Sequence, residues 1–311
     1  MYLDQRLQKR IDDKLSRLQK HRPLSKSLVA KLREQFSIEM TYNSTAIEGN
    51  TMTLQETFLV LKEGITIKGK SFEEHLEIKN HSEALRYLYA IIDQKKNLLI
   101  SHKLVRDIHA LVVRAQDHAQ PGSYRAVEVR ISGSQHVPPA GYLVSSQMNS
   151  FIKKYSRMSK LHPVEYAAWL HYDVVSIHPF LDGNGRTARL LMNLALMQKG
   201  YPLVILLKND RKKYYRLLEE GRTKDLAGFV NFIAQAIERS LDLYLSALEK
   251  SSVDSEMMKL SDLAENTEYS SEYLSLLARR GDLAAHKKGR LWYSNMDSIK
   301  EYKNNRLRKR D

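Results

Sequence analysis

The sequence contains no cysteine among its 311 residues. Disulfide bonds, thiol catalysis and cysteine-ligated zinc are therefore excluded, and any chemistry must come from histidine, carboxylates, hydroxyls or a hard metal ion. Apolar runs long enough to span a bilayer are also missing. The charged, periodic N-terminus, MYLDQRLQKRIDDKLSRL, offers no apolar stretch for a signal peptide. We therefore expect a cytoplasmic protein with no membrane partner.

Acidic residues are scarcer than basic ones, with 36 Asp and Glu against 50 Lys and Arg, which gives a net charge of +14. This balance attracts polyanions, so nucleotides, nucleic acids and acidic protein surfaces are all candidate partners, although a merely solvated basic surface has the same composition. Hydrophobic residues make up 42% of the chain and charged residues 28%. These proportions are typical of a globular protein, and the length suggests about two domains.

Helical periodicity runs through nearly the whole chain, without an internal repeat. In residues 1–40 apolar side chains recur at spacings of three to four, as amphipathic helices require; they are Leu7, Ile11, Leu15, Leu18, Leu28, Leu32 and Phe36. The same pattern predicts helices near residues 72–93, 101–116, 144–157, 163–176, 185–199 and 223–249. The fold is therefore expected to be mainly α.

Residues 122–143 break the helical pattern. Val127, Val129 and Ile131 alternate with polar residues, and the segments Ser132-Gly133-Ser134 and Pro138-Pro139 follow. This alternation predicts a short β-hairpin or an extended flap.

Residues 178–189, HPFLDGNGRTAR, combine several features suited to phosphate binding. Gly183, Asn184 and Gly185 directly precede a strongly helical run, and the free N–H groups of a helix N-terminus bind phosphate. Arg186 and Arg189 are three residues apart, so both guanidinium groups project from one face of the first turns. Two such groups beside an amide cradle suit a di- or triphosphate.

Two further residues of this segment add catalytic chemistry. Asp182 is a hard oxygen ligand placed to hold Mg²⁺ against the phosphates. His178, at the entrance of the loop, is a base of suitable pKa. Each element alone is more often structural, but their combination within twelve residues favours a phosphate-handling site.

The segment resembles the signature of the Fic family, H-x-F-x-[D/E]-G-N-G-R-x-x-R, at every fixed position. The resemblance covers about residues 40–235. It implies a Fic-type helical bundle with an N-terminal helical region (residues 1–100) and a catalytic core (residues 101–250). It also implies a protein adenylyltransferase that uses ATP and Mg²⁺ and modifies a serine, threonine or tyrosine hydroxyl of a target protein.

The resemblance assigns a role to each signature residue. His178 would deprotonate the hydroxyl, Asp182 would bind the metal, and residues 183–185 would form the anion hole. Arg186 and Arg189 would hold the outer phosphates. A kinase-like branch of the family has lysine after the acidic residue, whereas this chain has Gly183, so nucleotidyl transfer is favoured over phosphorylation.

Two regions outside the signature are further candidates. The flap would register an extended target segment by strand addition, through Ile131, Ser132, Gly133, Ser134 and His136. Tyr214 and Tyr215 are aromatic candidates for stacking on the nucleotide base, although both residue types also suit a core. His171 is expected in the core or close to the site, rather than as a metal ligand.

Residues 44–49, STAIEG, read from composition alone as the end of a helix with Gly49 as its cap. In the Fic family, however, [S/T]-x-x-x-E-[G/N] is an inhibitory signature, here on a helix near residues 40–49. The resemblance implies that Ser44 and Glu48 belong to this brake and that Glu48 forms a bidentate pair with Arg189, which would displace the γ-phosphate.

The composition shifts near residues 250–256, and residues 256–311 are predicted to form a separate small domain. A short helix from Leu260, a second helix ending at Gly281 and a β-hairpin turning at Gly289 together resemble winged helix–turn–helix modules. From Arg279 onward there are 11 Lys and Arg against 4 Asp and Glu, which suits phosphate contacts on DNA. Ser270 and Tyr273 would then face the groove. Docking to a protein or forming a homodimer stays open for such a module.

Two alternative functions stay open beside the adenylyltransferase. The same site could remove AMP, with Glu48 positioning water. The chain could also be a regulator in which the Fic domain senses nucleotide and the C-terminal module binds DNA.

Overall fold

The computed structural model describes the chain apart from residues 1, 23–25, 95–97, 158–160, 256 and 309–311. The chain divides into two compact units, Met1–Tyr244 and Leu245–Asp311. The division lies within one helix, whereas residue 256, where the sequence predicted a boundary, lies outside the described residues. The N-terminal helices belong to the same compact unit as the signature segment.

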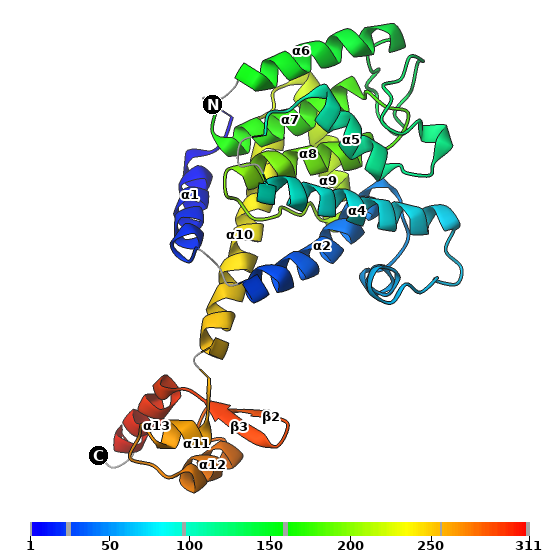
Figure 1. The fold of residues 1–311 in the computed structure, drawn as a ribbon. Coiled ribbons are helices and arrows are strands. Elements are labelled where there is room, and N and C mark those ends of the chain that lie inside the picture. The colour runs from blue at the N-terminus through cyan, green and yellow to red at the C-terminus, as the bar shows by residue number, and fades with distance from the viewer. Residues whose placement is uncertain (1, 23–25, 95–97, 158–160, 256, 309–311) are drawn as a thin grey trace. The chain divides into compact units, whose positions relative to one another are not determined.

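The larger unit is helical (Figure 1). Its α-helices are α1 (Gln5–Lys20), α2 (Lys26–Glu48), α3 (Leu54–Phe58), α4 (Phe72–Gln94), α5 (His102–Val112), α6 (Val144–Arg157), α7 (Pro163–Ile177), α8 (Asn184–Gln198), α9 (Arg211–Thr223) and the start of α10 (Ala227–Ser255). Four short helical segments are η1 (Leu59–Glu63), η2 (Asp117–Ala119), η3 (Gly141–Leu143) and η4 (Lys208–Asp210). No helix of the described residues is long and apolar enough to cross a membrane.

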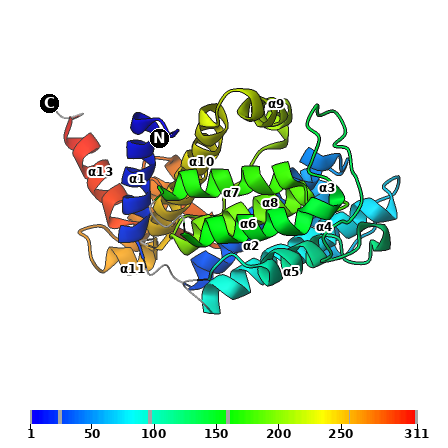
Figure 2. The same ribbon diagram turned by 90° about the horizontal axis from the view of Figure 1, so that it is seen from above.

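The helix α8 is the centre of the larger unit (Figures 1 and 2). It packs against α2, α4, α5 and α7, and every residue from Arg186 to Leu196 is buried. The helix α8 is thus buried on all faces although it carries arginine, threonine and asparagine side chains. These polar residues need partners from neighbouring helices, and the partners build the site.

Residues 122–140 form an extended flap without paired strands. Of the two predicted alternatives the extended flap is therefore present and the β-hairpin is not. Side-chain bonds join the two arms instead: Arg125 donates to the Pro139 carbonyl (2.7 Å), and the Gly141 N–H donates to the Glu128 carboxylate (3.1 Å). Arg125 also donates to the Val127 carbonyl of its own arm (2.7 Å). Pro138 and Pro139 supply no N–H group for a strand ladder, which explains why the alternating valines do not pair.

The smaller unit is built on a three-stranded antiparallel sheet in the order β1-β3-β2. Its elements after α10 are β1 (Met258–Lys259), α11 (Leu260–Ala264), α12 (Ser271–Arg280), β2 (His286–Lys288), β3 (Leu291–Ser294) and α13 (Met296–Arg308). Both predicted helices and the hairpin are present, with Gly281 and Gly289 at positive φ angles of 76° and 62°. The sequence did not predict β1 or α13.

The two residues predicted to face a DNA groove have structural partners in this unit. The Ser270 side chain caps α12 by accepting the Tyr273 N–H. The Tyr273 ring stacks on Tyr269 at 5.5 Å between centroids, and its hydroxyl bonds that of Tyr302. The half-buried Tyr273 thus contributes to the packing of its own unit, and its contact with DNA stays a prediction.

Candidate active site

The structure places His178 at the C-terminal cap of α7, in the left-handed conformation with φ 50° and ψ 59°. Its N–H group still donates to the Val174 carbonyl at 2.9 Å, while Pro179 prevents the helix from continuing. A non-glycine residue adopts this conformation at a cost of about 1–3 kcal/mol, which surrounding contacts must offset. His178 is thus fixed at a sharp bend directly before the glycine loop.

Arg125 supplies those contacts. Its Nε donates to the His178 carbonyl at 2.8 Å, and its backbone N–H donates to the Pro179 carbonyl at 2.9 Å. The Arg125 residue is only 2% exposed. It therefore ties the catalytic loop to the base of the flap. No local pattern in the sequence predicts this role, because the partners are brought together only by the fold.

The environment of His178 favours the neutral imidazole. Burial lowers the pKa of His178 and outweighs the negative charges of Glu48 and Asp182, which raise it. The Nδ1 atom is buried and has no hydrogen-bond partner among the described residues. A neutral imidazole at neutral pH is available to accept a proton.

The glycine loop presents the N-terminus of α8. Gly183 is the N-cap with φ 74°, and a Cβ at this position would lie 2.8 Å from a methyl group of Val113. Glycine is therefore required both for the turn and for the packing. The Asn184 side chain bonds the N–H and the carbonyl of Phe180, both at 2.9 Å. These bonds close the loop and leave the first N–H groups of α8 without intrahelical acceptors.

The brake residues meet α8 at this end. Arg189 Nη2 donates to Glu48 Oε1 at 2.7 Å and to the Ser44 carbonyl at 2.8 Å, and Arg189 Nε donates to the Ser44 hydroxyl at 2.9 Å. The pair uses one Glu48 oxygen on Arg189, not the expected bidentate geometry. A side chain at Gly185 would run into the Glu48 carboxylate. The carboxylate therefore lies over the helix N-terminus, where an anionic ligand would bind.

The end of α2 is held in place from α9. Arg211 Nε and the Tyr215 hydroxyl both donate to the Ile47 carbonyl, at 2.6 and 3.3 Å. The Tyr215 hydroxyl also lies 3.5 Å from Glu48 Oε2. Gly49 ends the helix with φ 118°, as expected for a glycine cap.

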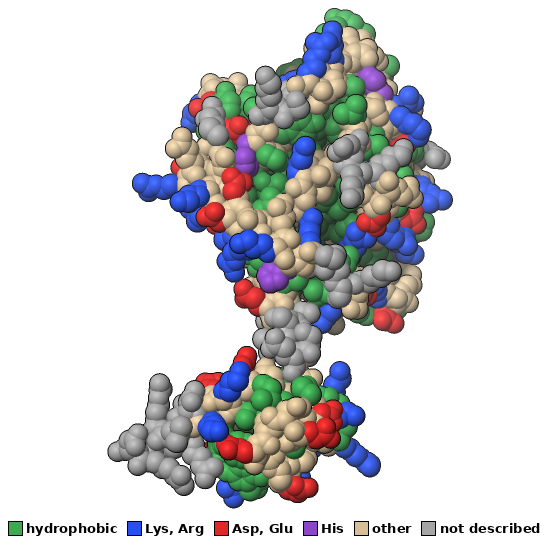
Figure 3. Space-filling view, turned by 60° about the vertical axis from the view of Figure 1, so that its left-hand side comes forward, with side chains coloured by type: hydrophobic (Ala, Val, Ile, Leu, Met, Phe, Trp, Pro, Cys, Tyr) green, Lys and Arg blue, Asp and Glu red, His purple; other side chains and the backbone are tan. Residues whose placement is uncertain are grey.

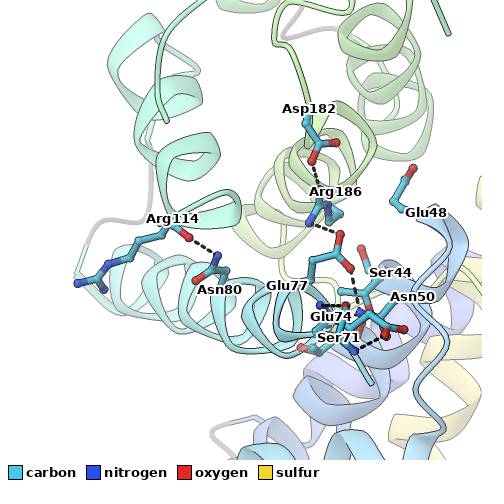
Figure 4. A network of polar contacts seen from close by, with 12 residues as sticks. Ser44, Glu48, Asn50, Ser71, Glu74, Glu77, Asn80, Arg114, Asp182 and Arg186 are labelled. Atoms are coloured by element: carbon cyan, nitrogen blue, oxygen red, sulfur yellow. Dashed lines mark hydrogen bonds and ion pairs between the residues drawn. The ribbon is translucent and has the colours of Figure 1, made fainter. Parts of the chain in front are cut away.

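Arg186 is paired on both sides (Figure 4). Its Nη2 bonds Asp182 Oδ2 at 2.8 Å, and its Nη1 lies 3.1 Å from Glu77 Oε1 of α4. Burial raises the pKa of Glu77, and the Arg186 charge opposes this shift. The sequence did not single out Glu77, because it resembles any other polar position of an amphipathic helix.

Both arginines keep unused donors. Arg186 Nε, Arg186 Nη1 and Arg189 Nη1 are buried and have no hydrogen-bond partner in the part of the chain that the structure describes. The contact of Arg186 Nη1 with Glu77 is an ion pair without hydrogen-bond geometry. A buried guanidinium donor without a partner is costly. Three of them on the first turns of one helix fit a ligand rich in oxygen acceptors, such as a polyphosphate.

Asp182 keeps its carboxylate accessible, with 47% of the side chain exposed. Burial raises its pKa, but Arg186 and the Gly183 N–H lower it further, so the net shift is downward and the group is charged at neutral pH. Among the described residues there is no cluster of three or more potential metal ligands. Mg²⁺ commonly binds one or two carboxylates together with substrate phosphates, so one charged, accessible carboxylate beside an anion site fits this ion.

His109, another residue that the sequence did not single out, holds the backbone of the glycine loop in place. Its Nδ1 accepts the Gly122 N–H, so Nε2 carries the proton and donates to the Asp182 carbonyl at 3.0 Å. Its ring stacks on Phe180 at 3.6 Å between centroids. Burial lowers the pKa of His109 to about 4. The neutral ring therefore fixes the backbone of Asp182.

The tip of the flap turns at Ile131–Ser134, where the Ser134 N–H donates to the Ile131 carbonyl at 3.1 Å. Gly133 has φ 74°, and Ser132 and Gly133 are exposed. The Ser134 hydroxyl bonds Glu219 of α9. His136 Nε2 bonds the Ser176 carbonyl of α7 at 2.8 Å. A side chain of α9 and a backbone carbonyl of α7 thus hold the flap beside the bend at His178.

Tyr214 is not available to stack on a base, which corrects that prediction. It is 2% exposed, and its hydroxyl lies 3.3 Å from Nε2 of the fully buried His171. Both residues belong to the aromatic core with Phe229. Tyr215 lies at the site, but the contacts of its hydroxyl are with the end of α2.

Comparison with known proteins agrees with this geometry. A model of the Fic/DOC family matches residues 99–196. The chain is 40% identical over 247 residues to the protein adenylyltransferase Fic of Drosophila persimilis, covering 79% of this chain and 48% of that protein. The chain spans about half the length of the curated relatives it matches.

Two solved structures resemble the larger part of the chain. Fic-1 (residues 134–508) of C. elegans superposes with a TM-score of 0.70 at 31% identity, covering 79% of this chain and 73% of that chain. A Fic domain containing signaling protein of Bacteroides thetaiotaomicron superposes with a TM-score of 0.72 at 28% identity, covering 78% of this chain and 97% of that chain.

Proposed function

Since this chain belongs to the Fic/DOC family, we propose that it is a protein adenylyltransferase, which transfers AMP from ATP to a hydroxyl group of a target protein. One observation carries the proposal. A neutral His178 is fixed at the mouth of a helix N-terminus whose first turns hold two buried arginines with unused donors. This arrangement combines a base with a polyphosphate site.

The reaction follows from these positions. An imidazole nitrogen of His178 accepts the proton of the target hydroxyl as its oxygen attacks the α-phosphorus of ATP. The bond between that phosphorus and the bridging oxygen to the β-phosphate breaks, pyrophosphate leaves, and AMP stays on the target oxygen. The N–H groups of α8 and the arginines stabilise the phosphate charge.

Asp182 would hold Mg²⁺ together with the phosphates of ATP. The ion would supply charge neutralisation on the phosphate oxygens. Arg186 already bonds Asp182, so it would keep this carboxylate ionised and oriented before the nucleotide enters. The Asp182 backbone is fixed by His109.

Glu48 acts as a brake in this proposal. Its carboxylate neutralises Arg189 and lies over Gly185, where it competes with an outer phosphate of ATP. The contacts of Arg211 and Tyr215 with Ile47 hold it there. Removal of AMP from a modified target, with Glu48 orienting a water molecule, is a second activity of the same site, favoured by the position of this carboxylate over the N-terminus of α8.

Intact-protein mass spectrometry tests the transferase. Wild type, Glu48→Gly and His178→Ala are incubated with ATP and Mg²⁺, and AMP adducts are quantified on the protein itself. Adducts that increase in Glu48→Gly and disappear when His178→Ala is added support the proposal. No adduct on any variant, with or without a candidate target, argues against it.

The smaller unit is proposed to bind DNA through its hairpin. Lys287, Lys288 and Arg290 are exposed around the turn, which suits phosphate contacts. Acidic side chains are also present on the face of this unit seen in Figure 3, so binding is expected to be weak and salt-dependent. Fluorescence anisotropy with a mixed-sequence duplex should show binding that the triple substitution Lys287→Ala, Lys288→Ala, Arg290→Ala removes. If the triple variant still bound the duplex as wild type does, this proposal would be contradicted.

A further inference from the structure

Each arginine of the anion site is paired with a glutamate from a different helix. Arg189 bonds Glu48 at the end of α2, whereas Arg186 lies 3.1 Å from Glu77 in α4. Arg186 is 1% exposed and the Glu77 side chain 19%. Glu48 is the last residue of its helix, but Glu77 lies within α4, which packs on α8. Glu77 is therefore held by a different helix from the one that carries Glu48.

Glu77 is also connected to the end of α2. Its second oxygen accepts Nδ2 of Asn50 at 2.9 Å, two residues beyond Glu48. Nδ2 of Asn50 also donates to the Glu74 carbonyl, and its Oδ1 accepts the Met52 N–H at 3.1 Å. All polar atoms of this amide are thus used, which fixes its orientation. Figure 4 shows the series from Asp182 through Arg186 and Glu77 to Asn50.

The Asn50 backbone completes the connection. Its N–H donates to the Thr45 carbonyl at 3.2 Å, so Asn50 closes the last turn of α2. Asn50 is 7% exposed. A displacement of Glu48 away from Arg189 must therefore disturb a residue that bonds the partner of Arg186.

We propose that Glu77 is a positioning residue that holds the Arg186 guanidinium at the anion site, and that Asn50 couples this pair to the helix end that carries Glu48. The inference rests on the proposed function, because it assigns Arg186 to the phosphates of ATP. Beside the Glu48 carboxylate, which ATP would displace, the site then has a second carboxylate, Glu77, which stays in place.

The charge balance explains why Arg186 needs Glu77. Without Glu77, the remaining counter-charge within hydrogen-bond distance of Arg186 among the described residues is Asp182. The guanidinium would then be drawn toward this carboxylate and away from the phosphates, and Asp182 would be less available to a metal ion. Loss of a partner that orients a ligand-binding group typically costs about 10- to 100-fold in affinity or activity.

The test of positioning uses the Glu48→Gly protein, with two readouts: the dissociation constant of ATP with Mg²⁺ by calorimetry, and the rate of AMP adduct formation. Glu77→Gln should weaken ATP binding or slow adduct formation by about 10- to 100-fold. Glu73→Gln, a matched change at an exposed position of the same helix, should do neither. Glu77→Asp keeps the charge and should therefore retain more ATP binding or activity than Glu77→Gln. Such a difference between the two variants would show that the effect of Glu77→Gln is not a general folding defect.

The action through Arg186 is tested by a double substitution. Once Arg186→Ala is present, adding Glu77→Gln should cause little further loss, because the group that Glu77 positions is gone. A full additional loss, or no effect of Glu77→Gln alone, overturns the positioning role.

The coupling is tested by Asn50→Ala. We expect it to raise adduct formation several-fold while Glu48 is present, and not to raise it in the Glu48→Gly protein. An equal rise in both, or a rise in neither, overturns the coupling. If the Glu48→Gly protein binds ATP but forms no adduct, the proposed transferase activity is wrong, and calorimetry on the Glu77 variants still tests the positioning role. If the Glu48→Gly protein binds no ATP, the transferase proposal and the positioning role are both wrong.

Discussion

Arg189 Nη2 lies 2.7 Å from Glu48 Oε1, and the arginine side chain is fully buried while 28% of the glutamate side chain is exposed. A buried guanidinium needs a counter-charge, and in this structure the Glu48 carboxylate supplies it. In the proposed function, activation would exchange this carboxylate for a phosphate of ATP.

Replacing Glu48 by glycine should raise self-modification with AMP. A charge-assisted hydrogen bond is worth about 1.5–3 kcal/mol, which corresponds to roughly 10- to 100-fold in rate. The rate of AMP adduct formation by intact mass spectrometry measures the effect. The matched control is Glu63→Gly, since Glu63 also ends a helical segment before a glycine at positive φ, Gly64. An unchanged rate in Glu48→Gly would contradict the brake.

The same variant should also change thermal stability. Without Glu48, the buried Arg189 loses its charged partner and keeps neutral ones such as Ser44, so the melting temperature should fall. ATP with Mg²⁺ should then raise the melting temperature of Glu48→Gly more than that of wild type, because the phosphate replaces the missing anion. Equal shifts in both proteins would show that Glu48 and ATP do not compete.

The pH dependence of adduct formation should report His178. Its pKa is lowered from 6.5 chiefly by burial, so the neutral base persists as the pH falls below 6.5. Activity of the Glu48→Gly protein should therefore decline only at a midpoint below 6.5. Removing Glu48 also removes a negative charge that raises this pKa, which moves the midpoint further down. An acid limb at or above pH 6.5 would argue against His178 as the base.

Asp182 should determine the requirement for Mg²⁺. Asp182→Asn removes the charged oxygen ligand and should lower the rate and raise the Mg²⁺ concentration that gives half the maximal rate. Chelation with EDTA should abolish adduct formation in the parent protein. Asp107→Asn, an equivalent change at a carboxylate that pairs with Lys103, serves as the control. A Mg²⁺ titration that is the same for Asp182→Asn and its parent would exclude this ligand.

The sequence predicted the parts of the protein that depend on local pattern. The periodic segments became α1, α2, α4, α5, α6, α7, α8 and α10, and the signature placed its residues on one loop and helix end. The helix α9 was not predicted, because RKKYYRLLEEGRT is dominated by charge. The sequence also did not predict the hydrogen-bond and ion-pair partners of the site residues. Glu77, His109 and Arg125 act through bonds between segments that only the tertiary fold brings together.

Buried histidines should make the larger unit sensitive to acid. His171 and His81 are fully buried, and desolvation lowers the pKa of each to about 3. The unfolded chain binds a proton at each below about pH 6.5 whereas the folded chain does not, so stability falls as the pH decreases from 6.5 toward 3. Each such group contributes a slope of up to about 1.4 kcal/mol per pH unit. Urea unfolding at pH 7, 6, 5 and 4.5 measures this loss of stability.

His171→Phe, which keeps a ring against Tyr214 and Phe229, should reduce the loss of stability between pH 6 and pH 4.5. A loss identical to that of wild type would mean that His171 takes up its proton in the folded state as well.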